Sequence, residues 1–427
     1  MNKKNGRLGI LKISILSLIS TLVKVLSALV INKAISVYIG PSGLAVIGQF
    51  QNLSVIIQNA ANGGINNGVI KYTAEGQHRG EFKSIFSTSL KLTIILSIIA
   101  SVIMMIFSNY MSFLFFGDGS FTYVFIVFGV TLTLFSINQL LLAIISGLSE
   151  VRLFISISVI QSLYSLIFTA LLVYFFSLDG ALIAMVTNQS IVLFIMLWML
   201  KGHDVIKFEN FLGKIERSQL IGLFKYSMMA LVSAITVPLS LIVIRDYIRS
   251  DISWEYAGYW QAMTYISSIG LMVVTTILSI YYLPRISEVK CRAEIFKEMF
   301  SIFRVIFPIA VFFAFLVYFS RFYIVDILFS SDFSHMIVLF KWQLFGDVIR
   351  VLACLLSYIM LAKAMTRTFI ATEIISSTLF VVLSILCINA FGFIGVSYAY
   401  AIANILYLSV MIIVMWCYFR SNSFSID

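Results

Sequence analysis

Residues 13–39 read ISILSLISTLVKVLSALVINKAISVYI, an apolar run of helical length that contains two lysines, Lys24 and Lys33. A lysine at the centre of a bilayer costs about 2.5–3.5 kcal/mol on insertion scales, so its side chain must point at protein or water. Small and polar residues recur here every three or four positions and so line one face of a helix: Ser14, Ser17, Thr21, Lys24, Ala28 and Asn32. The stretch therefore predicts a membrane helix that faces a hydrated, cationic interior.

The composition of the whole chain is that of an all-α polytopic membrane protein. Of its 427 residues, 61% are hydrophobic and 11% are charged, whereas soluble domains contain about 25% charged residues. A helix needs about 20 apolar residues to span a bilayer. Runs of this kind predict twelve transmembrane helices, at 11–39, 43–74, 84–108, 121–148, 153–177, 180–201, 217–247, 255–283, 299–319, 335–363, 368–390 and 393–419.

An internal repeat divides these helices into two groups of six. A displacement of 215 residues places loops on equivalent loops, with Gly43 on Gly258, Arg152 on Arg367, Phe154 on Phe369 and Gly180 on Gly395. We therefore predict an N-terminal six-helix half at 1–203, a cytoplasmic linker at 204–216 and a C-terminal six-helix half at 217–427. Two halves of the same orientation imply a pseudo-twofold axis along the membrane normal, with a central cationic cavity between them.

The basic residues predict the orientation of the chain. Eighteen of the 29 lysines and arginines fall in predicted loops on one side, against Arg249 and Arg321 on the other. By the positive-inside rule both termini are expected in the cytoplasm. The net charge of +10 follows from this topology, so we do not expect nucleic acid as a partner.

Several further polar residues fall inside predicted helices. Asn66 and Asn67 precede Lys71 in the second helix, where they line a polar lumen or form hydrogen bonds between helices. Lys33 has the alternative of extending to the membrane surface. Arg245 has the alternative of an interfacial ion pair with Asp246.

The tenth and eleventh predicted helices carry one deep cation and two acids. Arg350 and Asp347 are three residues apart and can pair along one helix face. Asp347 and Glu373 are candidates for coupling transport to protons or Na⁺. Cations outnumber acids among these intramembrane residues, which favours an anionic substrate such as a phosphate. An exporter of organic cations would instead need carboxylates and aromatic cages.

No motif for catalysis or metal binding is present, so neither an enzyme nor a resident cofactor or metal is expected. The four cysteines lack metal-ligand spacing, and there is no Gly-rich phosphate loop or GxSxG. The short predicted loops argue against a glycan polymerase or transferase. A membrane scaffold would give no reason for the charges inside the spans.

Several strings resemble bacterial Wzx-type lipid-intermediate flippases, in the multidrug/oligosaccharidyl-lipid/polysaccharide (MOP) superfamily. They are residues 20–24 (STLVK), 40–44 (GPSGL), 66–72 (NNGVIKY), 253–261 (SWEYAGYWQ), 282–285 (YLPR) and 342–347 (WQLFGD). Between about 84 and 200 no such motif is present.

The resemblance implies a flippase of the bacterial inner membrane that works by alternating access. Its substrate would be an undecaprenyl-pyrophosphate-linked oligosaccharide, the O-antigen repeat unit, moved from the cytoplasmic to the periplasmic leaflet. Alternatives are the lipid III intermediate of enterobacterial common antigen, or a drug exchanged for a cation. Membrane lipids, a polysaccharide polymerase and a chain-length regulator are the expected partners. The residues expected to bind substrate are Lys24, Lys33, Asn66, Asn67, Lys71, Arg245 and Arg350.

Overall fold

The computed structural model describes residues 3–79, 82–203, 205–213, 217–289, 291–363 and 365–421, and within these ranges it contains helices and no strands. The first part of the chain forms α1 (Lys3–Tyr38), α2 (Gly40–Ala61), α3 (Asn66–Arg79), α4 (Phe82–Ile106), α5 (Ser108–Phe116), η1 (Gly119–Phe121), α6 (Thr122–Gly147), α7 (Val151–Met199) and η2 (Phe208–Phe211). The remainder forms α8 (Arg217–Asp251), α9 (Trp254–Ile277), η3 (Leu278–Tyr282), α10 (Leu283–Glu288), α11 (Arg292–Phe319), α12 (Arg321–Leu328), η4 (Ser331–Leu339), α13 (Phe340–Ala362), α14 (Thr366–Phe391), η5 (Gly392–Ile394) and α15 (Gly395–Ser421).

The predicted all-α membrane architecture is confirmed. Eight segments of the described chain are long and apolar enough to cross a membrane by length and composition. Two of them, Val151–Met199 and Thr366–Arg420, contain 49 and 55 residues, about twice the length that one crossing needs. Each of these two coincides with a predicted pair of spans. The first bends at Ser177, whose φ is +50°.

The two predicted spans missing from those segments are the ones that the structure breaks. The sequence predicts a continuous helix at 43–74, but α2 ends at Ala61 and α3 begins at Asn66. Gly63 and Gly64 lie between them with φ of +60° and +62°, a conformation that a right-handed helix does not allow. The predicted span 255–283 likewise passes from α9 into the π-helical turn η3 and then α10.

The helix bounds follow the 215-residue displacement found in the sequence. α6 ends at Gly147 and α13 at Ala362, 215 residues later. α7 begins at Val151 and α14 at Thr366, again 215 residues apart. The short helix α5, which the sequence analysis does not predict, has a counterpart in α12 at nearly the same displacement.

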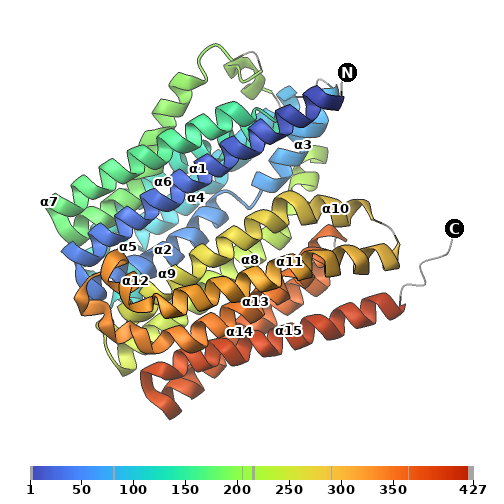
Figure 1. Ribbon diagram of the computed structural model, residues 1–427. Helices are drawn as coiled ribbons and strands as arrows, with labels where there is room; N and C mark the ends of the chain where they lie inside the picture. The colour runs from blue at the N-terminus through green and yellow to red at the C-terminus, as the bar shows by residue number, and fades with distance from the viewer. Residues whose placement is uncertain are drawn as a thin grey trace. The chain divides into compact units, whose positions relative to one another are not determined.

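The chain forms two compact units, one of residues 1–39 and 49–235, the other of residues 40–48 and 236–427. In the first unit α1 and α6 both pack along α7 (Figure 1). In the second unit α15 packs along both α13 and α14 (Figure 1). The two halves at 1–203 and 217–427 stay a prediction. Of the predicted linker, residues 204 and 214–216 lie outside the described residues.

Helix α4 shows how packing works where lipid replaces water. Its buried face is polar and small, with Ser89, Thr93, Ser97 and Ser101 at a spacing of four residues. The opposite face is apolar and exposed, as at Ile99, which is 51% exposed. Apolar side chains gain little by leaving lipid, so membrane helices associate through small residues that allow close approach.

Equivalent glycines in the two units occupy equivalent tight turns. A Cβ atom on Gly180 would overlap the carbonyl of Leu172, and one on Gly395 would overlap the carbonyl of Cys387. Backbone atoms cannot move aside as a flexible side chain can. We therefore expect Gly180→Ala and Gly395→Ala each to destabilise the protein by about 1–3 kcal/mol, the usual cost of overpacking.

Thermal unfolding of the purified protein in detergent measures this effect. Gly270→Ala is the matched control, because its Cβ would meet only the ring of Phe313, at 3.3 Å. Equal melting temperatures for all three variants would contradict the prediction.

Candidate functional site

The first unit contains a cavity of about 490 Å³ with a polar lining. The lining comes from α1, α3, α6 and both parts of α7: Lys24, Ser27, Ala28, Ile31, Asn66, Ile70, Gln139, Leu142, Ala143, Ser146, Phe154, Ser158, Gln161, Ser162, Ser165, Asn188 and Gln189. We call this cavity the amide chamber. Among the described residues that line it, Lys24 is the charged group and no carboxylate occurs.

Helical periodicity explains why these residues meet. From α1, Lys24, Ser27, Ala28 and Ile31 face the chamber, positions i, i+3, i+4 and i+7 of one helix face. The same spacing appears in α6 at 139, 142, 143 and 146, and in α7 at 158, 161, 162 and 165. Of the polar face predicted for α1, Lys24 and Ala28 line the chamber.

Hydrogen bonds hold the amides of the chamber in place. Gln139 Nε2 donates to Gln189 Oε1 at 2.5 Å, and Asn188 Nδ2 donates to Ser165 Oγ. Asn188 Oδ1 is buried and accepts no hydrogen bond within the described part of the protein. The chamber is therefore lined by amides held in fixed positions, which suits a ligand that carries hydroxyl groups.

Among the described residues, Lys24 is the one ammonium that lines the chamber. Its side chain is exposed there, and it forms no ion pair or hydrogen bond with the other described residues. An ammonium without a counter-ion attracts anions, and phosphate is a frequent partner of lysine.

The second unit contains a smaller cavity of about 210 Å³. Its lining comes from α8, α9, α13, α14 and α15: Val237, Ser240, Leu241, Thr264, Ser267, Ser268, Leu271, Gln343, Arg350, Glu373, Ser376, Ser377, Phe380, Tyr400, Ala403, Asn404 and Tyr407. We call it the arginine cavity. Under the 215-residue displacement its lining matches that of the amide chamber, with Glu373 at the place of Ser158, Ser376 of Gln161, Ser377 of Ser162 and Asn404 of Gln189.

Charge distinguishes the arginine cavity from its counterpart. Tyr407 donates to Glu373 at 2.9 Å and Tyr400 donates to Asp347 at 2.8 Å. With the other described residues, the Arg350 side chain forms no hydrogen bond and no ion pair within 4.0 Å, although Glu373 lines the same cavity. The predicted direct pairing of Asp347 with Arg350 is thus replaced by the tyrosine contact.

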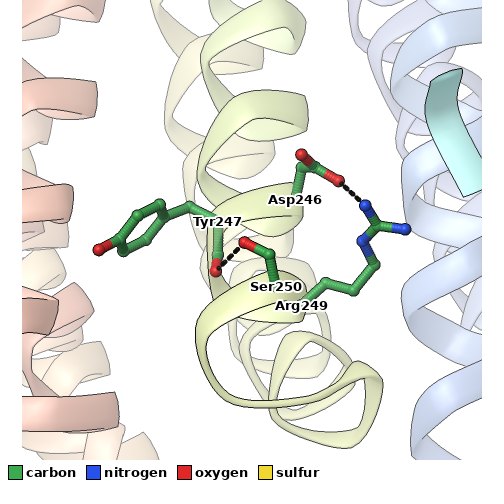
Figure 2. A network of polar contacts seen from close by, with 4 residues as sticks. All are labelled: Asp246, Tyr247, Arg249 and Ser250. Carbon is green, nitrogen blue, oxygen red and sulfur yellow. Dashed lines mark hydrogen bonds and ion pairs between the residues drawn. The ribbon is translucent and has the colours of Figure 1, made fainter. Parts of the chain in front are cut away.

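The structure places Arg245 in the packed interior of the second unit, at 1% exposure. Its guanidinium donates to Gln261 Oε1 and lies 5.6 Å from the ring centroid of Trp260. Asp246, considered from the sequence as its ion-pair partner, instead pairs with Arg249 at 2.7 Å, as Figure 2 shows. Arg245 lines neither of the two cavities.

Of the other predicted substrate residues, one lines the amide chamber and three lie outside its lining. Asn66 lines the amide chamber, whereas Asn67, next to it on α3, is exposed and lies outside the lining. Lys71 forms an ion pair with Glu75, with 3.6 Å between Nζ and Oε1. Lys33 is half-buried on α1 and also lies outside the lining.

Four amide residues of the chamber escape the sequence analysis: Gln139, Gln161, Asn188 and Gln189. All four lie in the region between 84 and 200, where the sequence shows no family motif. The signal was nevertheless present, because an amide inside an apolar helix must find a polar partner. Gln161 also lies three residues from Ser158 and four from Ser165, a spacing that could have revealed the shared face.

Comparison with known proteins adds relatives over nearly the whole chain. No family model matches. The chain is 26% identical over 404 residues to the lipid III flippases of Escherichia coli (strain K12) and Shigella flexneri, which covers 94% of this chain and 97% of each relative. The chain is thus similar to the lipid III flippases over nearly its whole length.

Solved structures show which fold the chain shares. It superposes on an inward-facing multidrug resistance MATE family transporter of the MOP superfamily with a TM-score of 0.75 and 14% identity, covering 94% of this chain and 96% of that chain. A MOP superfamily transporter from Pyrococcus furiosus, described as having a binding pocket of reverse polarity, gives a TM-score of 0.70 at 13% identity over 95% of both chains. The resemblance seen in the sequence is confirmed.

Proposed function

We propose that this protein is a flippase that moves an undecaprenyl-pyrophosphate-linked oligosaccharide from the cytoplasmic to the periplasmic leaflet by alternating access. The observation that carries the proposal is the amide chamber, with one ammonium, no carboxylate in its described lining, and a wall of amides and hydroxyls. The relatives named lipid III flippase support the same substrate class.

The chemistry of the chamber fits the two polar parts of such a substrate. A pyrophosphate is an anion that cannot enter hydrocarbon without a cationic partner, and Lys24 supplies one. Amides donate and accept hydrogen bonds, as sugar hydroxyls also do, so Gln139, Gln189 and Asn66 suit a glycan. The polyprenyl chain needs no protein cavity, because it stays in lipid.

We assign the predicted substrate residues according to their places. Lys24 and Asn66 bind substrate in the amide chamber, and Arg350 provides a second cation in the arginine cavity. Asn67 and Lys71, which follow Asn66 on α3, and Lys33 on α1 act along the path to the chamber. Arg245 acts through Gln261, which it holds.

Ion coupling is assigned to the arginine cavity. Glu373 lines the cavity and shares it with Arg350, while Asp347 is held by Tyr400. Binding of a proton or Na⁺ to these carboxylates would change the charge that faces Arg350.

We further propose an inner-membrane location with both termini in the cytoplasm, because the loop lysines and arginines gather on the side of the termini. A polysaccharide polymerase and a chain-length regulator are the partners that would receive the product. The cargo is the O-antigen repeat unit, with the lipid III intermediate as the alternative.

Transport by the purified protein in vesicles tests the proposed function. Vesicles containing the wild-type protein and a fluorescent undecaprenyl-pyrophosphate oligosaccharide should expose the glycan on the opposite leaflet, where an added glycosidase can cleave it. A cationic drug in the same vesicles should not be exchanged, because the described lining of the chamber offers no carboxylate. Drug movement without glycan movement would replace the proposal with a drug antiporter.

A further inference from the structure

One face of α11 carries two arginines with two aromatic rings between them. Arg292, Phe296, Phe300 and Arg304 follow each other at a spacing of four residues, so they share one helix face, and all four are exposed. The Arg292 guanidinium lies 5.7 Å from the ring centroid of Phe296, and that of Arg304 lies 4.7 Å from the ring centroid of Phe300. Both cations therefore extend toward the rings between them.

The end of α15 adds to this surface. Phe419 packs against Phe296 with 4.6 Å between ring centroids, and Arg292 lies 5.6 Å from the Phe419 ring. Arg420 lies 5.2 Å from the ring centroid of Trp416, and both of these side chains are exposed. We call this set, Arg292, Phe296, Phe300 and Arg304 of α11 with Trp416, Phe419 and Arg420 of α15, the arginine–aromatic face.

Arg304 is the residue of this face whose charge most needs a partner. It is exposed on a helix that is apolar and long enough to cross a membrane, next to Val305, which is 59% exposed. Among the described residues it has no ion pair, and Glu298 on the same helix is bound by Arg285 at 2.9 Å. A charge at such a place is costly unless something outside the helix neutralises it.

The backbone adds a polar group at the same position. Pro308 follows Arg304 by four residues and has no N–H, so it cannot donate the helical hydrogen bond to the carbonyl of Arg304. The Arg304 carbonyl oxygen therefore lacks its usual helical donor, which leaves this part of α11 more polar than the apolar residues around it.

We propose that the arginine–aromatic face binds an anionic phospholipid of the surrounding leaflet. The lipid phosphate binds the Arg304 guanidinium, which offers planar donors suited to phosphate oxygens. Arg292 lies about 18 Å away along the helix and adds positive charge at the end of the same face. The acyl chains run along the exposed rings and aliphatic side chains beyond Phe300. The exposed acid Glu294 is outweighed on this helix end by Arg292, Lys297 and Arg304, so the face keeps its positive charge.

Native mass spectrometry of the full-length protein with added phosphatidylglycerol or phosphatidylethanolamine tests the site. Wild-type protein should keep phosphatidylglycerol preferentially after detergent exchange. Arg304→Gln should weaken phosphatidylglycerol binding about tenfold, because it removes a hydrogen bond between charged groups. Phe300→Leu should weaken it as well, because it removes the ring that holds the guanidinium while leaving every charge in place.

The control is Arg321→Gln. Arg321 is also stacked on aromatic rings, at 4.3 Å from Tyr318 and 4.5 Å from Phe322, but it lies beyond the other end of α11. It should keep the wild-type lipid preference. Wild-type lipid binding in Phe300→Leu, or an equal loss in Arg321→Gln, would overturn the site and leave only a general attraction of lipid to positive charge. Melting temperatures without added lipid show whether each variant is folded.

Discussion

Replacing Lys24 with alanine should lower glycan transport by about 10- to 100-fold, the factor that corresponds to losing an interaction between charged groups. Lys24 is the ammonium of the amide chamber, and the described lining holds no other cation that could replace it. The neutral variant would leave the pyrophosphate without a counter-ion inside a low-dielectric cavity. Surface polysaccharide in cells, measured at matched protein levels, and cleavage of the exposed glycan in vesicles both report this loss.

Two variants separate charge from fold in this experiment. Lys24→Arg keeps the cation and should recover most of the transport, although its planar donors differ from a point charge. Lys33→Ala removes a lysine from the same helix outside the chamber lining, so its loss should be clearly smaller. Full polysaccharide in Lys24→Ala would remove the amide chamber from the mechanism.

A second pair of variants examines the amides that the sequence analysis missed. Gln189→Leu removes the acceptor of Gln139 and buries an unpaired amide, so it should reduce transport of the glycan substrate. The double variant Gln139→Leu/Gln189→Leu lacks both partners of this hydrogen bond. It should be more stable than Gln189→Leu alone but should still lack the contacts to sugar. Recovery of transport in the double variant would show that the amides only stabilise the helices, and melting temperatures would reveal the folding effect.

The sequence predicted the helices well because bilayer thickness and helical rise leave few choices for an apolar run. The same physics explains what it missed. The break at Gly63–Gly64 has a turn signal in the sequence, Asn62-Gly63-Gly64, which a count of apolar residues does not record. The interruption at η3 depends on backbone conformation inside an apolar segment. The 215-residue repeat predicts that the spans 43–74 and 255–283 are equivalent, but it does not predict that both are interrupted.

For the candidate site, the sequence identified charges more readily than their surroundings. Lys24 and Arg350 were found because charges inside apolar helices are rare and costly. The residues that line the amide chamber together with Lys24 were missed, because Gln139, Ser158 and Gln189 meet only after α6 and both parts of α7 pack together. For Arg245 the sequence predicted a role in substrate binding, because it lies inside an apolar helix. It could not show that the guanidinium is already bound to Gln261 and packed near Trp260.

Replacing Glu373 with glutamine should make transport insensitive to pH or Na⁺ while preserving the fold. Glu373 faces Arg350 across the arginine cavity and accepts a hydrogen bond from Tyr407, which the glutamine Oε1 can also accept. Arg350→Gln should harm folding more, because it removes the positive charge that shares the cavity with the Glu373 carboxylate. Combining both substitutions removes both charges, so the double variant should recover part of the stability lost in Arg350→Gln.

Transport in vesicles under imposed proton or Na⁺ gradients distinguishes these outcomes, with melting temperatures reporting the fold. Glu255→Gln, an exposed acid in the first turn of α9, is the matched control and should respond to the gradients like the wild-type protein. Coupling that persists in Glu373→Gln would shift the role to Asp347, because Tyr400 holds that carboxylate beside the same arginine. Coupling that persists in Asp347→Asn as well would exclude the arginine cavity as the coupling site and leave Arg350 with a role in substrate binding or in packing.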